Sequence, residues 1–101
     1  MALETPTGGG RVLLTRASVS EDAVVYDVAL NGPDGTWLGT SSIDIATGQL
    51  ELGPFTGSGE APGWLVESAR TFLRTVWSQR KKENPPVWPR RVRRWRAPKG
   101  A

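Results

Sequence analysis

The 101-residue sequence contains no cysteine and no histidine. Without cysteine the chain forms no disulfide and offers no thiolate to a metal ion. Without histidine it lacks the commonest general base and the commonest metal ligand. Its carboxylates form no evident catalytic pair. These absences predict a protein that is not an enzyme and that needs no metal or other cofactor.

Long apolar runs are also missing from the sequence. The longest candidate, residues 23–26, has the length of a strand, whereas a membrane-spanning helix needs about 18–20 apolar residues. Residues 1–5 have neither the basic start nor the apolar stretch of a secretory signal. The sequence therefore predicts no membrane span and a cytoplasmic location.

Charge is divided unevenly along the chain, although the net charge is only +3. Residues 1–61 contain two arginines and eight acidic residues, a net charge of −6, whereas residues 62–101 have a net charge of +9. Such asymmetry is typical of a protein with a basic binding arm.

Four strands are expected in the first half of the chain. Residues 1–10 form no apolar pattern and are expected to be a flexible leader. Alternating apolar residues predict strands, which cover residues 11–20, 23–30, 36–45 and 49–52. The turn at residues 31–35 contains Pro33 and Gly35, and residues 46–48 form a second short turn. Short turns between successive strands indicate an antiparallel meander.

One long helix is expected after a Gly/Pro-rich connection. Its apolar residues recur at helical spacing: Trp64, Leu65, Ala69, Phe72, Leu73, Val76 and Trp77. Pro62 suits the first turn, and Asn84 before Pro85 ends the helix. The sequence thus predicts an α+β domain over residues 11–84, in which a four-stranded antiparallel meander is covered on one face by one amphipathic helix.

Residues 85–101 are expected to form a basic Trp/Arg tail. Pro89 can open a short helix in which Trp88, Val92 and Trp95 share one face. Burial of these apolar side chains is favourable, so we expect the tail to dock on the domain to about residue 95. Two alternatives remain open. A docked tail buries its tryptophans and leaves its arginines facing outward, whereas an undocked tail is a linear recognition arm. The spacing Pro-x-x-Pro-x-Arg from Pro86 to Arg91 also matches polyproline ligands.

Arginine and tryptophan together are typical of a nucleic-acid-binding surface, because guanidinium groups bind phosphates and indole rings stack on bases. On the helix, Arg70, Arg74 and Lys81 lie within about 40° of one another and form a basic stripe. The predicted phosphate-binding residues are Arg70, Arg74, Lys81, Arg90, Arg91, Arg93, Arg94 and Arg96. Trp37, Trp88 and Trp95 are candidates for stacking or docking, with Trp37 either in the core or exposed as a platform.

The order of the predicted elements resembles Whirly and Pur-type single-stranded nucleic-acid-binding proteins. The resemblance is carried by the hairpin with Val24, Tyr26 and Val28 before residues 33–37, and by the helix over residues 64–77. It covers about residues 11–80. The resemblance implies a sheet face that binds single strands and a dimer formed around the helices. A strand region of net charge −6 should repel phosphate, which makes the helix stripe and the tail the better candidates.

We therefore predict a non-enzymatic nucleic-acid-binding accessory protein with little sequence specificity. The alternative is a protein-interaction module or homodimer whose tail docks on a partner, since free sheet edges and exposed tryptophans favour association. A tail that binds anionic membranes is a third possibility. Neither a small-molecule substrate nor a choice between DNA and RNA is indicated by the sequence.

Overall fold

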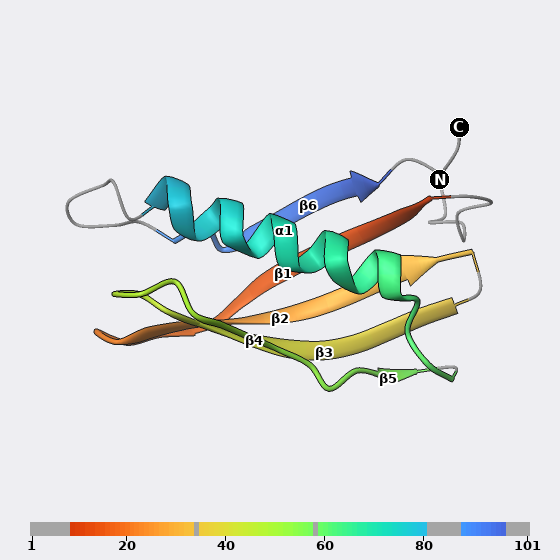
Figure 1. Ribbon diagram of the computed structural model, residues 1–101, viewed down its shortest axis with the longest axis horizontal. Helices are drawn as coiled ribbons and strands as arrows, with labels where there is room; N and C mark the ends of the chain where they lie inside the picture. The colour runs from red at the N-terminus through yellow and green to blue at the C-terminus, as the bar shows by residue number, and fades with distance from the viewer. Residues whose placement is uncertain (1–8, 34, 58, 81–87, 97–101) are drawn as a thin grey trace.

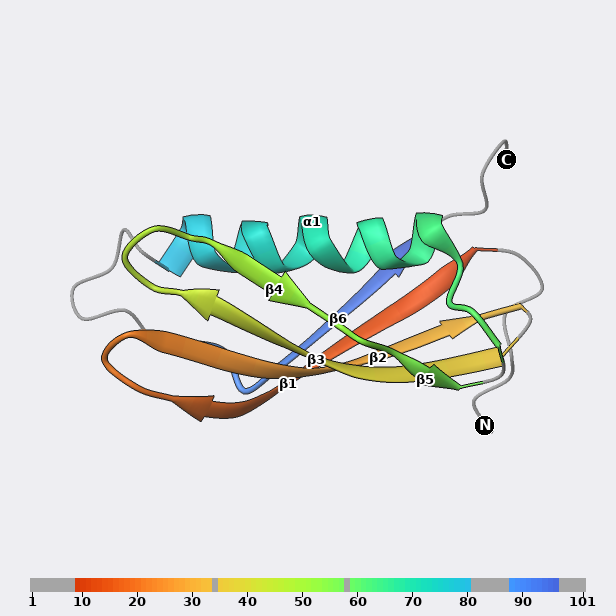
Figure 2. The ribbon, with the colours of Figure 1, turned by 60° about the horizontal axis from the view of Figure 1, so that its bottom comes forward.

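The computed structural model describes residues 9–33, 35–57, 59–80 and 88–96, except for the side chains of Trp95 and Arg96. Its elements in chain order are β1 (Gly10–Val19), β2 (Ala23–Gly32), β3 (Gly35–Asp44), β4 (Leu50–Leu52), β5 (Thr56–Gly57), α1 (Gly63–Arg80) and β6 (Arg91–Arg96). Two layers result, with α1 lying along one face of the sheet (Figures 1 and 2).

The sheet is antiparallel in the order β4-β3-β2-β1-β6, and β5 pairs with another part of β3. The predicted α+β class, with an antiparallel sheet and one helix, is confirmed. The predicted number of four strands is wrong, because the sheet also contains β5 and β6. Strand β1 consequently lies inside the sheet rather than at its edge.

Alternation along the strands separates a covered face from an open face. On the covered face, Val12, Leu14, Tyr26, Val28 and Leu30 are buried beneath α1. The residues between them face the other way and form what we call the open face, which no described element covers. A register shift between Arg16 and Ser18 interrupts the alternation of β1, which explains the irregular apolar pattern near its end.

Helix α1 starts directly after Pro62, whose carbonyl accepts hydrogen bonds from the amides of Leu65 and Val66. The predicted stripe packs on the sheet through Leu65, Ala69, Leu73 and Val76. The predicted end of the helix at Asn84 lies outside the described residues, as do residues 1–8 of the predicted leader. Gly10, placed in that leader, is instead the first residue of β1.

The predicted short helix after Pro89 is wrong, because residues 91–96 form the strand β6. It pairs with β1 from Gly10↔Arg96 to Thr15↔Arg91. An extended chain supplies the hydrogen bonds that β1 would lack as an edge strand, and backbone groups in a covered sheet need such partners. The helical spacing that would bring positions 88, 92 and 95 onto one face is absent from this strand, and the side chain of Trp95 lies outside the described part of the chain.

Candidate nucleic-acid interface

Residues 88–90 are fixed to the sheet before β6 begins. Trp88 is 4% exposed and belongs to the core, and its carbonyl accepts a hydrogen bond of 2.9 Å from Nη1 of Arg16. The hydroxyl of Tyr26 donates to the carbonyl of Pro89 at 2.7 Å. The amide of Arg16 donates to the carbonyl of Arg90 at 2.8 Å. These contacts determine where β6 enters the sheet and which of its arginines face outward.

Tyr26 gives this attachment a pH dependence. Burial raises the pKa of Tyr26 to about 12, and the charges of Arg16 and Arg80 offset part of that increase. The unfolded tyrosine ionises near pH 10, so the folded state holds the proton more tightly. We expect the free energy of unfolding to be unaffected below about pH 10 and to fall by roughly 2–3 kcal/mol as the pH rises through 12.

This expectation can be measured because Tyr26 is the one tyrosine of the chain. Tyrosinate absorbance follows its ionisation, and urea unfolding at each pH gives the stability. Tyr26→Phe is the control: it should lose about 1–3 kcal/mol at neutral pH by leaving the Pro89 carbonyl unpaired, and it should lack the tyrosine-dependent alkaline step. An equal alkaline loss in both proteins would contradict the assignment.

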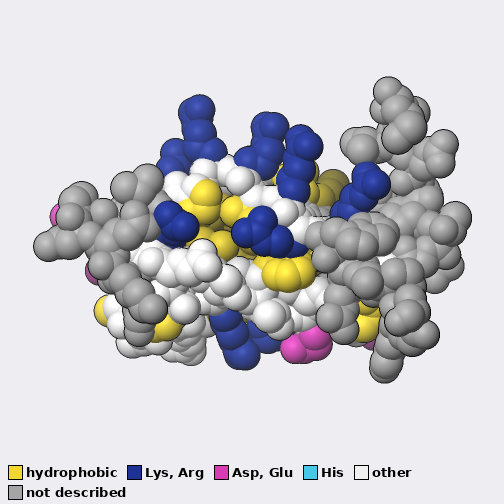
Figure 3. Space-filling view, turned by 90° about the horizontal axis from the view of Figure 1, so that it is seen from above, with side chains coloured by type: hydrophobic (Ala, Val, Ile, Leu, Met, Phe, Trp, Pro, Cys, Tyr) yellow, Lys and Arg dark blue, Asp and Glu magenta, His cyan; other side chains and the backbone are white. Residues whose placement is uncertain are grey.

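Four exposed arginines gather around β6, and we call Arg90, Arg91, Arg93 and Arg94 the basic edge. At about 3.3 Å per residue they extend over about 13 Å. Within the described part of the chain none of them forms an ion pair with a carboxylate. Seen from the side where β6 lies, basic side chains are spread over the surface, and acidic ones are visible at its margins (Figure 3). The basic edge is therefore a concentration of positive charge that no described carboxylate compensates.

The arginines of the basic edge face in two directions. Arg91 and Arg93 lie opposite Thr15 and Leu13, on the open face, whereas Arg94 lies opposite buried Val12. Nη1 of Arg94 donates to the neighbouring carbonyl of Arg93 at 2.8 Å. A polyanion that follows the edge strand can reach side chains on both sides of it.

A hollow of about 510 Å³ adjoins the basic edge on the open face. Its lining residues are Arg11, Val12, Leu13, Ala29, Asn31, Thr36, Arg93 and Arg94. A shallower hollow of about 430 Å³ continues toward β3, where Leu38 is 59% exposed. The volumes are in the range of ligand sites, which combine apolar walls with a few polar groups.

The described acidic residues of the first half do not gather in these hollows. Among the described residues, Asp27 is the one acidic residue that lines either hollow. The Asp44 carboxylate instead accepts the amides of Ala46 and Thr47 in a turn. The net charge of residues 1–61 predicted repulsion of phosphate for the whole sheet. Among the described residues the carboxylate that lines a hollow is that of Asp27, and no described carboxylate lines the hollow beside β6.

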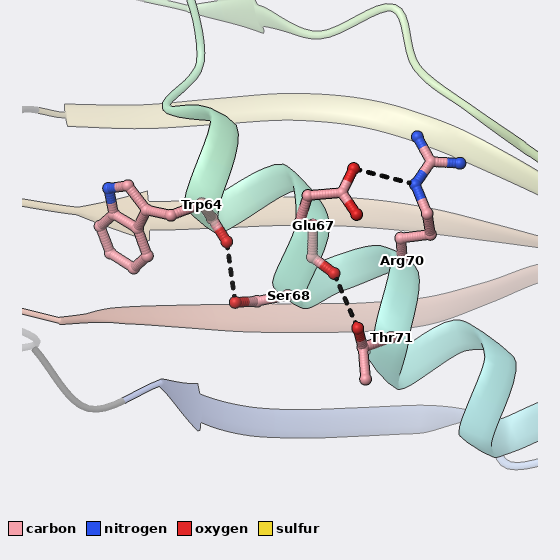
Figure 4. Close-up of polar contacts among 5 residues, drawn as sticks. All are labelled: Trp64, Glu67, Ser68, Arg70 and Thr71. Atoms are coloured by element: carbon pink, nitrogen blue, oxygen red, sulfur yellow. Dashed lines mark hydrogen bonds and ion pairs between the residues drawn. The ribbon is translucent and has the colours of Figure 1, made fainter. Parts of the chain in front are cut away.

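The helix stripe does not continue the basic edge. Glu67 and Arg70 lie on the side of α1 toward β3, whereas β6 lies on the other side (Figure 4). Nε of Arg70 also pairs with Oε1 of Glu67 at 3.3 Å. Arg74 is exposed one turn further along α1. Lys81, the third predicted member of the stripe, lies outside the described residues, so the predicted track from helix to tail is not continuous in the described residues.

Of the three tryptophans that were candidates for stacking, Trp37 and Trp88 are buried. Trp37 is 2% exposed, and its indole N–H donates to the carbonyl of Gly59 at 3.1 Å. The platform alternative for Trp37 is therefore wrong, and buried Trp88 is equally unable to stack on a base. Position 95 pairs with Arg11 by register, but the side chains of Trp95 and Arg96 lie outside the described part.

Arg11 is a candidate that the sequence did not single out. It lies on β1 and lines the larger hollow together with Arg93. A lone arginine in a strand carries no binding signal by itself. Arg11 becomes a binding candidate only when β6 pairs with β1, because that pairing brings basic residues that are distant in the sequence to one end of the sheet.

Comparison of the chain with protein-family models, with curated proteins and with solved structures gives no match.

Among the described residues, no group of three or more acidic, histidine or cysteine side chains is placed to hold a metal ion. No described helix is long and apolar enough to cross a membrane. The chemistry that the arrangement supports is binding of an anion at the basic edge.

Proposed function

We propose that this protein binds nucleic acid without strong sequence specificity and without catalysing a reaction. The observation that carries the proposal is the basic edge, with four exposed arginines in five residues and no carboxylate partner within the described chain. Uncompensated like charges repel one another, and a chain of phosphates relieves that repulsion. Guanidinium groups bind phosphate oxygens through paired hydrogen bonds.

Contacts of this kind position a nucleic acid but do not read its sequence. Arg91 and Arg93 offer phosphate contacts on the open face, next to the apolar floor formed by Leu13 and Ala29. A flexible single strand can place an unpaired base against this floor while its phosphates stay on the arginines. A duplex keeps its bases stacked inside, so the geometry favours single strands.

The salt dependence of binding tests this proposal. If the four arginines of the basic edge neutralise four phosphates, log K should fall with log salt concentration with a slope of about −2.8 for a single strand. The corresponding slope for a duplex is about −3.6. Fluorescence anisotropy of labelled oligonucleotides at several salt concentrations gives both values. Absence of binding at low salt, or an affinity independent of salt, would overturn the proposal.

A further inference from the structure

The outer edge of β6 has no strand beside it among the residues that the structure describes, because the sheet order ends there. Alternate residues of an antiparallel strand direct their N–H and C=O groups to the same neighbour. Since the Arg90 carbonyl accepts the amide of Arg16, the pairing register makes Val92 and Arg94 bond to β1. The N–H and C=O groups of Arg91 and Arg93 therefore point away from the sheet.

The chemistry of these backbone groups selects the kind of occupant. Each outward residue presents a donor and an acceptor, and a phosphate chain supplies only acceptors. An extended peptide supplies both in alternation, as in the addition of a strand to a sheet edge. Side chains of an added strand would lie directly opposite Arg91 and Arg93, with Cβ atoms about 4.5–5.5 Å apart.

We propose that the outer edge of β6 binds an extended acidic segment of a partner protein as an additional strand, with Asp or Glu at alternate positions opposite Arg91 and Arg93. Charge complementarity supports this occupant. A second copy of β6 would place arginine opposite arginine, which is unfavourable. The proposal goes beyond nucleic-acid binding and does not depend on it, because it uses the backbone of β6 as well as its charge.

Amide hydrogen exchange of the full chain, measured by NMR, tests the proposal with a capped hexapeptide of alternating Glu and Val. We expect the peptide to slow exchange at Arg91 and Arg93 by tenfold or more, and to leave Val92 and Arg94 unchanged because these amides already bond to β1. Arg91→Gln with Arg93→Gln should weaken peptide binding about tenfold. Arg90→Gln with Arg94→Gln removes the same charge and should weaken it much less.

Two control peptides separate strand addition from charge attraction alone. One has the same composition with three Glu followed by three Val, and the other is the alternating peptide with N-methyl groups on the pairing amides. Affinity equal to that of the alternating peptide for either control would overturn the proposal. So would protection of Arg91 and Arg93 in the free protein, which would mean that a second copy or another segment of the chain occupies the edge. Oligonucleotide binding without strand addition would leave the proposed function standing and reject this inference.

Discussion

Trp88→Ala is expected to lower the free energy of unfolding by about 3–5 kcal/mol, the usual loss when a buried tryptophan is truncated. Trp88 is 4% exposed and lies in the core cluster with Val92. The substitution leaves a cavity where residues 88–90 are attached to β1 and β2, so it should also loosen β6. Small domains have total stabilities of about 5–15 kcal/mol, so this loss removes a large share.

Thermal and urea unfolding measure this effect. For a domain of this size, each kcal/mol shifts Tm by about 4–8 °C, so Trp88→Ala should lower Tm by about 12 °C or more. Arg93→Gln is the matched control in the same segment, and as an exposed substitution it should change stability by less than about 0.5 kcal/mol. A Tm change below about 4 °C for Trp88→Ala would show that residue 88 contributes little to the core.

The strands before α1 and the helix itself could be predicted because their apolar residues repeat with periods that local sequence reveals. Val24, Tyr26, Val28 and Leu30 alternate and are all buried in β2, as a strand with one covered face requires. Leu65, Ala69, Leu73 and Val76 recur at helical spacing and pack on that face. In both elements the same side of the backbone meets the core along its whole length.

Strand β6 could not be predicted in the same way, because its sequence contains few apolar residues and their spacing is ambiguous. Trp88, Val92 and Trp95 match a helical i, i+4, i+7 pattern, whereas in an extended chain only positions 88 and 92 share a face. What decides between them is distant, since β1 has an edge that needs backbone partners.

The binding surface depends on the same long-range pairing. The arginines of the tail were evident from the sequence, but their direction was not. The strand period of two turns Arg91 and Arg93 toward the open face and places Arg94 opposite Val12. The burial of Trp37 also depends on a distant segment. The segment with Gly57 and Gly59 covers its side chain, and the residues of its own strand did not reveal this.

Replacing both Arg91 and Arg93 by glutamine should reduce affinity for a single-stranded oligonucleotide about 25-fold at 0.1 M salt. Each lost phosphate contact removes about 0.7 from the slope of log K against log salt concentration, so the slope should change from about −2.8 to about −1.4. Arg70→Gln with Arg74→Gln is the matched control, since it removes the same charge from α1. Arg70 lies on the side of the helix away from β6 (Figure 4), and Arg74 follows four residues later, about 40° around the helix. Its loss of the Glu67 ion pair should cost at most about 1 kcal/mol of stability, and its salt slope should equal that of the unmodified protein. Equal weakening by the two pairs would mean that overall charge, not the basic edge, determines binding, and weakening by the helix pair alone would place the site on α1.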